Sequence, residues 1–312
     1  MSADVAGRLV FLVNPASANG SLGRRWPEIA ATAERLGIVG TTRLSERAGQ
    51  LEELAREAAL EGAERIVVVG GDGTLNEVVN GILGAGVERP PELGVVARGT
   101  GQDFVRTYGI PSDVAKALEI VRDGDVRTID AGKATFRAED GAERVRWFAN
   151  MASAGLSGAV ARRANHTSKA LGGKTSFFVA LVQVFARWRN VELEVDLDGE
   201  RRNGRMTDVV VANGQYHGGA MWLAPEAKQD DGLFDALVIG DITKGDFILN
   251  VARIYRGTHL SHPKIELVRA ARVRVDSKHP LPIEVDGEQP GTTPVTFEVV
   301  PAALRVRVPP AQ

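Results

Sequence analysis

The sequence predicts two domains: an α/β domain built on a parallel sheet, and a mostly antiparallel β-sandwich that carries helical insertions. Three observations support this fold class. First, 312 residues are more than one hydrophobic core usually fills. Second, short apolar strand-like runs alternate with helix-like segments up to residue 128, which is typical of a parallel sheet covered by helices. Third, from residue 129 onward most strand-like runs follow one another across short turns.

In the first domain, the apolar run 9–13 ends at Asn14-Pro15 and therefore predicts a buried strand followed by a loop. Segment 51–60 is rich in Ala, Glu and Leu, which favour helix. Further strands are expected at 41–44, 65–69 and 93–96, and further helices at 26–36, 75–83 and 114–122. We assign residues 1–128 to this nucleotide-binding domain and consider that residues 301–312 return to it.

The second domain, assigned to residues 129–300, is expected to bind the substrate. Dipeptides such as Asp198-Gly199 and Asp286-Gly287 are typical hairpin turns between its strands. Two helical insertions are expected, at 157–188 and 244–255. The expected strands are 128–136, 144–149, 191–197, 207–212, 234–239, 264–267, 271–276, 283–285, 295–299 and 304–308.

Composition narrows the function classes. The net charge of −2 lacks the basic field of a dedicated nucleic-acid binder, so we expect no nucleic-acid partner. The absence of cysteine excludes disulfides, thiolate metal sites and a cysteine nucleophile. The longest apolar stretch, 177–186, is about half of the ~20 residues that a membrane-spanning helix needs. The N-terminus lacks the features of a secretory signal, and we expect a cytoplasmic protein without a transmembrane segment.

The segment with the clearest chemical meaning is the turn Gly-Gly-Asp-Gly-Thr at residues 70–74. It joins a β-branched strand to a helix, so backbone N–H groups and a helix N-terminus can face a phosphate. It is neither a P-loop, because it has no Gly-Lys-Ser/Thr, nor a dinucleotide fingerprint, because it lacks the GxGxxG spacing. A tight turn with an Asx cap is the alternative interpretation. An acidic residue such as Asp72 in a phosphate loop implies a cation or a positioned water.

Two further loops have the same character. Residues 97–106 follow a strand and contain Gly99, Thr100 and Asp103, and residues 14–20 follow the first strand. Open α/β sheets bind their ligands at the carboxyl ends of parallel strands. Three such loops in one domain predict a nucleotide site.

These loops resemble those of the diacylglycerol kinase catalytic domain family, which includes bacterial lipid kinases and sphingosine kinases. The family's GGDGTLNEV segment is matched in full by residues 70–78. Its Asn-Pro-x-Ser-Gly loop is matched by residues 14–18, with Ala18 in place of glycine. Its Gly-Thr-x-Asn-Asp-Phe-Ala-Arg loop is similar to residues 99–106, with Gln102 in place of asparagine. The resemblance covers nearly the whole chain and implies that the α/β domain is similar to those of phosphofructokinase and NAD kinase.

The resemblance implies an ATP site and a catalytic Mg²⁺ in the first half of the chain. Asp72, Asp103 and Asp130 would hold the ion, largely through water. For Asp130 the alternative is that it simply starts a strand. The implied ATP contacts are Asn14, Ser45, Gly70, Gly71, Asp72, Gly73, Thr74, Leu75, Asn76, Gly99 and Thr100.

In the second half, residues 213–219 and 224–235 are similar to a bacterial lipid kinase pattern. The resemblance implies a structural Mg²⁺ held by the side chain of Asp231 and the carbonyl oxygens of Lys228 and Leu233. An acidic turn between strands is the alternative. The segment Val-Asp-Gly-Glu at 285–288 matches the family's VDGE, which makes Glu288 the implied general base, with Asp72 as the other catalytic residue. The alternative for Glu288 is a solvated turn residue.

The lipid site is less readable from the sequence. His217, Met221 and Trp222 could line a pocket or meet the bilayer, although core or loop packing is the commoner role for such residues. Residues 177–188 could form an apolar wall, for which a buried core helix is the alternative. The basic residues Arg162, Arg163, Lys169 and Lys174 could favour an anionic membrane surface, for which a solvated helix face is the alternative.

The expected reaction is transfer of the γ-phosphate of ATP to a lipid hydroxyl, with diacylglycerol giving phosphatidic acid, at the inner face of the membrane. A sphingoid base, ceramide or monoacylglycerol is an alternative acceptor. NAD kinases and phosphofructokinases share the GGDGT fold, but the VDGE segment argues against both. Asp72, Asp103 and Glu288 argue against a non-catalytic nucleotide-binding regulator. Sheet edges could pair two copies into a homodimer.

Overall fold

The computed structural model describes residues 8–165 and 173–311, and their side chains apart from those of residues 165 and 173–177. The chain divides into two compact units. One extends to Ile129 and includes the C-terminal residues from Ala302, and the other is Asp130–Pro301. The chain passes from one unit to the other within two long strands, β5 (Asp125–Arg137) and β17 (Thr292–Val308).

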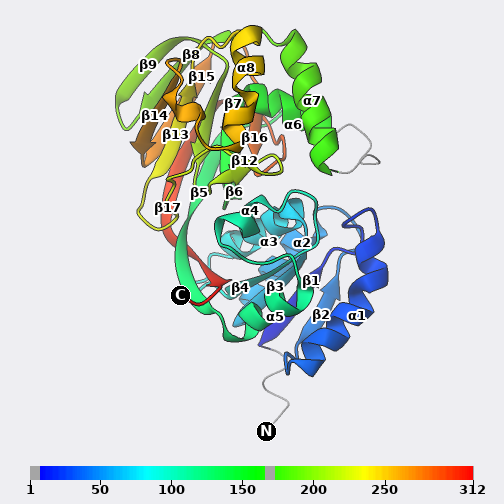
Figure 1. The fold of residues 1–312 in the computed structure, drawn as a ribbon. Coiled ribbons are helices and arrows are strands. Elements are labelled where there is room, and N and C mark those ends of the chain that lie inside the picture. The colour runs from blue at the N-terminus through cyan, green and yellow to red at the C-terminus, as the bar shows by residue number, and fades with distance from the viewer. Residues whose placement is uncertain (1–7, 166–172, 312) are drawn as a thin grey trace. The chain divides into compact units, whose positions relative to one another are not determined.

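The first unit is built on a parallel sheet, as the sequence predicts. Its strands lie in the order β2 (Thr41–Leu44), β1 (Leu9–Val13), β3 (Arg65–Gly70) and β4 (Glu92–Ala97), followed by the C-terminal end of β17 (Figure 1). All these pairings are parallel. β3 is buried along nearly its whole length, which explains its unbroken run of Ile and Val.

Helices cover both faces of this sheet. β2 and β3 lie on opposite sides of β1, so right-handed crossovers place α1 (Ser21–Arg35) and α2 (Gln50–Leu60) on opposite faces. α3 (Asp72–Gly84) packs on α2, and α5 (Val114–Asp123) packs on α1. The strand order therefore reverses at β1, and the loops after β1 and β3 lead to helices on different faces. Such a switch point is where open α/β sheets place their ligand sites.

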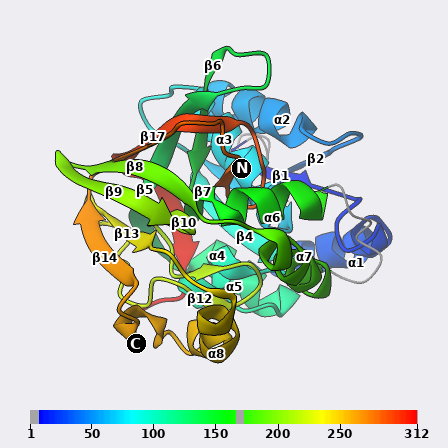
Figure 2. The same cartoon turned by 90° about the horizontal axis from the view of Figure 1, so that it is seen from above.

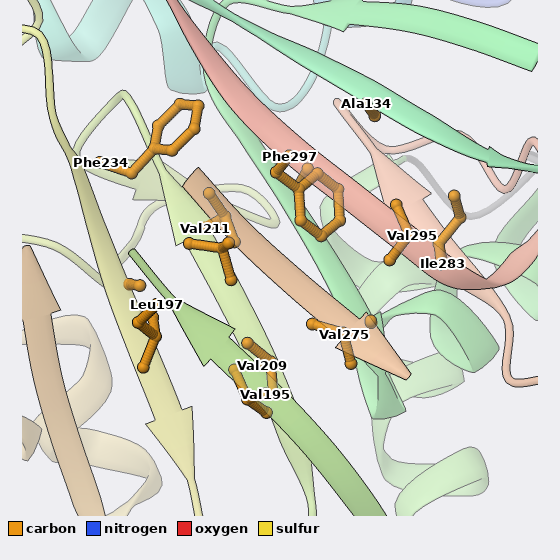
Figure 3. Close-up of a cluster of buried hydrophobic side chains, with 14 of the residues drawn as sticks. Ala134, Val195, Leu197, Val209, Val211, Phe234, Val275, Ile283, Val295 and Phe297 are labelled. Atoms are coloured by element: carbon orange, nitrogen blue, oxygen red, sulfur yellow. The ribbon is translucent and has the colours of Figure 1, made fainter. Parts of the chain in front are cut away.

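The second unit is the predicted antiparallel sandwich. One layer has the strand order β14 (Ile265–Ala270), β13 (Phe234–Ile239), β10 (Asp208–Ala212), β7 (Met151–Gly155), β16 (Ile283–Val285). The other contains β15 (Arg272–Ser277), β8 (Val191–Leu197), β9 (Glu200–Met206) and β6 (Glu143–Phe148), together with parts of β5 and β17. Val209, Phe234 and Phe297 are among the buried side chains that fill the space between the layers (Figure 3).

Three helices cover the outer face of the first layer. They are α6 (Leu156–Asn165), α7 (Gly173–Arg187) and α8 (Lys244–Tyr255), and a 3₁₀ turn, η2 (His259–Ser261), follows α8. Successive side chains of β10 point to opposite faces of its layer. Val209 and Val211 enter the sandwich core, whereas Val210 and Ala212 contact the helices. A short hairpin of β11 (Tyr216–His217) and β12 (Met221–Trp222) forms a separate two-stranded sheet.

Several elements differ from the sequence prediction. The strands expected at 295–299 and 304–308 are one continuous strand, β17, although Pro301 lies between them. The helical insertion expected at 157–188 agrees with the structure, in which α6 and α7 span nearly all the described residues of this segment. Strands β7 and β9 and the short helix α4 (Asp103–Thr107) were not predicted. Within the described part of the chain, no helix combines the length and the apolarity needed to cross a bilayer.

Candidate active site

Three loops of the first unit meet at the carboxyl ends of β1, β3 and β4. The backbone N–H of Asn14 donates to the carbonyl oxygen of Val69 at 3.1 Å, and that of Arg98 donates to the carbonyl oxygen of Gly70 at 2.6 Å. The side-chain amide Nδ2 of Asn14 donates to Oγ1 of Thr74 at 3.0 Å. The three loops that the sequence analysis identified separately are therefore joined by hydrogen bonds into one cluster.

Glycines allow two of these loops to touch through their backbones. A Cβ atom placed on Gly99 would lie 2.5 Å from the Cα of Gly71, and one placed on Gly70 would lie 2.5 Å from the side chain of Thr74. Gly71 is the N-cap of α3 and provides no side-chain cap. The N-terminus of α3 therefore carries backbone N–H groups without a side-chain acceptor at the cap, which suits a phosphate oxygen.

Asp72 fixes the third loop. Its Oδ2 accepts a hydrogen bond from the backbone N–H of Gln102 at 2.8 Å, and its Oδ1 accepts one from that of Asp103 at 3.1 Å. Gln102 adopts a left-handed conformation with φ of 59° and is the N-cap residue of α4. The Asp72 carboxylate, 30 residues earlier in the chain, thus caps α4 in place of a local side chain.

Two carboxylates lie close together at this point. A Cβ on Gly101 would lie 2.4 Å from Oδ2 of Asp72 and 3.7 Å from Oδ2 of Asp103. Burial raises the pKa of Asp72, and the charge of Asp103 raises it further, whereas backbone hydrogen bonds oppose both effects. Arg106 approaches Asp103 from the other side, with Nη1 3.1 Å from Oδ1. A cation beside this pair would relieve the repulsion, so the donor set fits a Mg²⁺ ion bound largely through water.

The other predicted nucleotide contacts differ in accessibility. Ser45 continues from β2, where its backbone N–H donates to the carbonyl oxygen of Val13 at 3.0 Å. Asn76 is 2% exposed, and its Oδ1 accepts a hydrogen bond from Nδ2 of Asn80 at 3.3 Å, so its amide is engaged inside the unit. A cavity of about 10 Å³ beside Gly70 and Phe104 has room for one water at most. This cavity is therefore too small to hold a nucleotide.

In the second unit, Glu288 closes the tight turn that the sequence predicts. The backbone N–H of Val285 donates to the Glu288 carbonyl at 2.9 Å, and that of Glu288 donates to the Val285 carbonyl at 3.0 Å. Asp286 and Gly287 both have positive φ, as a type I′ turn requires. The carboxylate of Asp286 accepts hydrogen bonds from the backbone N–H groups of residues 149, 150 and 151 at 3.0, 3.1 and 2.9 Å. The turn is thus fastened to β7, and Glu288 lies on its exposed side.

A buried acid that the sequence analysis missed lies in β16, next to this turn. Glu284 is 1% exposed, and its carboxylate accepts hydrogen bonds from the backbone N–H of Gly287 and from Oγ of Ser153, the latter at 3.2 Å. Nε2 of His217 lies 3.9 Å from Oε2 of Glu284. Burial raises the pKa of Glu284 to about 7, against the opposing effect of His217. The position of this acid between the apolar residues Ile283 and Val285 of a short strand could have indicated a buried carboxylate from the sequence alone.

His217, Met221 and Trp222 have packing roles. His217 and Met221 are 7% and 6% exposed, and the Trp222 ring stacks on Tyr216 with centroids 5.7 Å apart. His217 and Met221 therefore do not form a surface for the bilayer. Asp208 is another buried acid near His217, and burial raises its pKa to about 6. It caps α6, because its Oδ2 accepts the backbone N–H of Ser157 at 2.9 Å.

The expected structural Mg²⁺ site is occupied by protein interactions. Oδ1 of Asp231 accepts the backbone N–H of Leu233 at 3.2 Å, and Oδ2 forms an ion pair with Arg269. Arg269 also lies 3.5 Å from Asp235. Among the residues that the structure describes, no group of three or more His, Asp or Glu side chains could hold a metal ion. A cation at Asp231 would therefore compete with Arg269 for the carboxylate, and the site of Lys228, Asp231 and Leu233 stays a prediction.

Asp130, the third predicted ligand of the catalytic ion, belongs to the second unit. Its Oδ2 accepts the backbone N–H of Gly232 at 2.8 Å, and its backbone carbonyl accepts a hydrogen bond from Nδ2 of Asn213 at 3.0 Å. Asp130 is 3% exposed. It therefore joins β5 to the loop that carries Asp231, in addition to any role at an ion.

Comparisons with known proteins match both halves of the chain. Residues 8–134 match the diacylglycerol kinase catalytic domain, and residues 150–308 match the YegS C-terminal NAD kinase beta sandwich-like domain. A diacylglycerol kinase of Staphylococcus carnosus is 29% identical over 306 residues, covering 97% of this chain and 95% of the relative. A diacylglycerol kinase of Bacillus subtilis is 30% identical over 291 residues, covering 93% and 92%.

Solved structures confirm the predicted fold class. A candidate diacylglycerol kinase from Bacillus anthracis superposes with a TM-score of 0.75 at 23% identity, over 97% of both chains. Yeast NADH kinase in complex with NADH superposes with a TM-score of 0.53 at 12% identity, over 96% of this chain and 82% of that one. At these identities the likeness concerns the fold.

Proposed function

The chain belongs to the diacylglycerol kinase family, and from this membership we propose that it transfers the γ-phosphate of ATP to a lipid hydroxyl, with diacylglycerol as the first candidate. The observation that carries the proposal is the cluster of the three loops, in which Asp72 and Asp103 lie close together beside the N-terminus of α3. Phosphoryl transfer depends mostly on positioning and on neutralising negative charge. This cluster offers the groups for both tasks.

The nucleotide is proposed to bind across the loops after β1, β3 and β4. Backbone N–H groups at the start of α3 would donate to phosphate oxygens, and Gly70, Gly71 and Gly99 leave room for this close approach. Thr74 is held by Asn14 and lies 3.4 Å from Oγ of Ser17, so its hydroxyl has a fixed position. Asn76, being buried, would act through α3 and not through a direct contact.

Mg²⁺ is the ion proposed for Asp72 and Asp103, with Asp130 as a third partner. When bound, such an ion neutralises charge on the transferring phosphoryl group. A carboxylate has about four acceptor positions, and the backbone N–H groups of residues 102, 103 and 104 use some of those of Asp72, so it can still accept a hydrogen bond from water. Holding the loop and orienting such water are compatible tasks for one carboxylate.

Glu288 is proposed to accept the proton of the lipid hydroxyl. A carboxylate on a rigid turn can be held at one place, and Asp286 supplies three hydrogen bonds that fasten this turn. Glu284 fastens the turn through Gly287 from within its own strand. The proton of the lipid hydroxyl would therefore be transferred to a glutamate whose backbone is held in place by the hydrogen bonds of Asp286 and Glu284.

The identity of the lipid is tested by incubating the purified protein with ATP, Mg²⁺ and a total lipid extract, followed by mass spectrometry of phosphorylated products. We expect phosphatidic acid as the product. If the product is instead a phosphorylated sphingoid base, ceramide or monoacylglycerol, then that lipid alcohol is the substrate in place of diacylglycerol. Phosphorylation of NAD or a sugar phosphate in parallel reactions would overturn the lipid assignment. Tight ATP binding without turnover on any acceptor would favour a nucleotide-binding regulator.

The place of action follows from the two substrates. ATP is dissolved in the cytoplasm, whereas diacylglycerol stays in the bilayer, so the proposed reaction takes place at the inner face of the membrane. We propose that the protein visits this surface transiently from the cytoplasm. Cell fractionation with the membrane pelleted at low and high salt measures the bound fraction.

A further inference from the structure

Exposed apolar side chains are concentrated on α7 and α8. Among the described residues, twelve large hydrophobic side chains are exposed, and half of them lie on these two helices. Ile248 and Leu249 are 71% and 80% exposed, and no residue of α8 is classed as buried. Single exposed hydrophobic residues are ordinary, but such a concentration marks a surface for interaction. The six are Phe178, Val179, Val182, Ile248, Leu249 and Tyr255.

The exposed residues are not the result of a loosely attached helix. The rings of Phe185 on α7 and Phe247 on α8 lie 4.3 Å apart between centroids. Lys244, at the start of α8, donates hydrogen bonds to the carbonyl oxygens of Phe185 and Trp188 at the end of α7. In Figures 1 and 2 the two helices lie next to each other on the outer side of the second unit. Each helix thus has an inner apolar side in contact with the unit and a second one that faces outward.

The electrostatic surroundings are basic. The sequences of α6, α7 and α8 contain one acidic residue, Asp246, whose carboxylate is paired with Nζ of Lys264 at 2.7 Å. The whole chain has a net charge of −2, so basic residues are enriched on these helices relative to the rest of the chain. Their basic residues are Arg162, Arg163, Lys174, Arg187, Lys244 and Arg253.

We propose that the outward sides of α7 and α8 form a docking surface for a bilayer rich in anionic lipid, with Ile248 and Leu249 entering the interface. An interfacial helix combines apolar residues that enter the acyl boundary with basic residues that meet anionic headgroups. Arg253 follows Leu249 by about one turn of α8 and provides a basic group beside the apolar pair, whereas the ammonium of Lys244 is used in contacts with residues 185 and 188. The inference rests on the proposed function only in taking a lipid as the substrate, because docking needs neither ATP nor turnover.

Charge decides against a second copy of the chain as the occupant. Two such faces would bring Arg187 and Arg253 of both copies together, and like charges oppose association. An anionic bilayer has the complementary charge. The attraction between basic residues and anionic headgroups adds to the insertion of the apolar side chains.

The test compares the wild type with the double variant Ile248→Ser/Leu249→Ser in sedimentation with vesicles of phosphatidylglycerol and phosphatidylcholine, without ATP. We expect the partition coefficient of the double variant to fall by about tenfold or more, because two large apolar side chains no longer enter the interface. Binding of the wild type should weaken on pure phosphatidylcholine and at high salt. The matched control is Leu60→Ser, at the end of α2 in the other unit, where the side chain is 60% exposed. The control should bind as the wild type does.

Vesicle binding by the double variant equal to that of the wild type would overturn the proposal. So would a wild-type dimer in solution that the double variant loses, together with equal partition, since this would assign the face to a second copy. Turnover on short-chain diacylglycerol dispersed in detergent separates docking from chemistry. Normal vesicle binding without any lipid turnover would refute the proposed reaction and leave the docking surface in place. Normal turnover in detergent without vesicle binding by the wild type would refute the docking surface and leave the proposed reaction in place.

Discussion

Oε2 of Glu284 lies 3.9 Å from Nε2 of His217, and both side chains are buried. The same carboxylate accepts the backbone N–H of Gly287, one residue before Glu288. The buried carboxylate of Glu284 therefore supports the turn that holds the proposed general base. The protonation of the buried Glu284 can therefore affect the position of the exposed Glu288.

Stability should depend on the protonation of Glu284. Its pKa rises from 4.5 to about 7 on folding, so the folded state binds more protons than the unfolded state between these values. Stability is then lost as pH rises through this window, by on the order of 3 kcal/mol. Glu284→Gln keeps an acceptor for Gly287 and should flatten this loss, in urea unfolding at pH values from 4.5 to 8. Asp208, whose pKa rises to about 6, maintains part of the slope in the variant. Equal slopes in both proteins would contradict the assignment.

Removing the proposed base should abolish turnover and preserve the fold. Glu288→Gln keeps the size of the side chain and the backbone bonds of the turn, so the melting temperature and ATP affinity should stay near wild-type values. kcat should fall by about a hundredfold or more, as expected for loss of general-base catalysis. Glu143→Gln, an exposed glutamate of β6 in the same unit, is the control and should leave kcat unchanged. Near-normal turnover by Glu288→Gln would remove Glu288 from the mechanism.

Asp72 and Asp103 should respond differently to neutralisation. Asp72→Asn leaves one of the backbone N–H groups of residues 102 and 103 facing an amide donor, at a cost of about 1–3 kcal/mol in unfolding free energy. Asp103→Asn removes the same charge repulsion without disturbing these two bonds. Both variants should lose turnover and require more Mg²⁺, but only Asp72→Asn should lose marked stability. Chemical unfolding and turnover against Mg²⁺ concentration measure the two effects, and equal stability of the variants would refute the capping role.

The contact between the loops should tolerate no side chain at Gly99. In Gly99→Ala the new Cβ would meet the backbone of Gly71 at 2.5 Å, and a backbone cannot yield as a flexible side chain can. The loops must separate, so we expect ATP affinity to fall by about tenfold and stability by about 1–3 kcal/mol. Gly245→Ala in the first turn of α8 meets only one atom, at 3.8 Å, and is the control. Calorimetric ATP binding equal in both variants would disprove the loop packing.

Local chemistry made the first unit largely predictable. The buried strand β3 and the glycines after it lie in one short segment. The conformation of each of these residues depends mainly on its neighbours in the sequence, so the segment could be predicted. The capping of α4 by Asp72 could not be predicted in the same way, because donor and acceptor are 30 residues apart and meet only through the sheet order. Likewise, Arg269 neutralises Asp231 from 38 positions away, which no pattern around Asp231 indicates.

Strands without a hydrophobic pattern were also missed. β7 is Met-Ala-Ser-Ala-Gly, in which four of the five residues are small and all are buried between two neighbouring strands, and β9 is mostly polar. β17 continues through Pro301, which the sequence suggested as a break. In each case sheet neighbours from distant parts of the chain stabilise the strand, and their contribution exceeds local propensity.

The course of β17 also sets the order in which the protein can be completed during synthesis. Residues 305 and 306 pair with β4 in the first unit, and Arg307 donates two hydrogen bonds to Glu92 at 2.8 and 2.6 Å. The ribosome makes these residues after the whole second unit, so the nascent N-terminal unit waits with one edge of β4 unpaired until the second unit has been synthesised. A stop codon directly after Pro301 would therefore damage the unit that is made first, because the first unit depends on a strand that is made after the second unit.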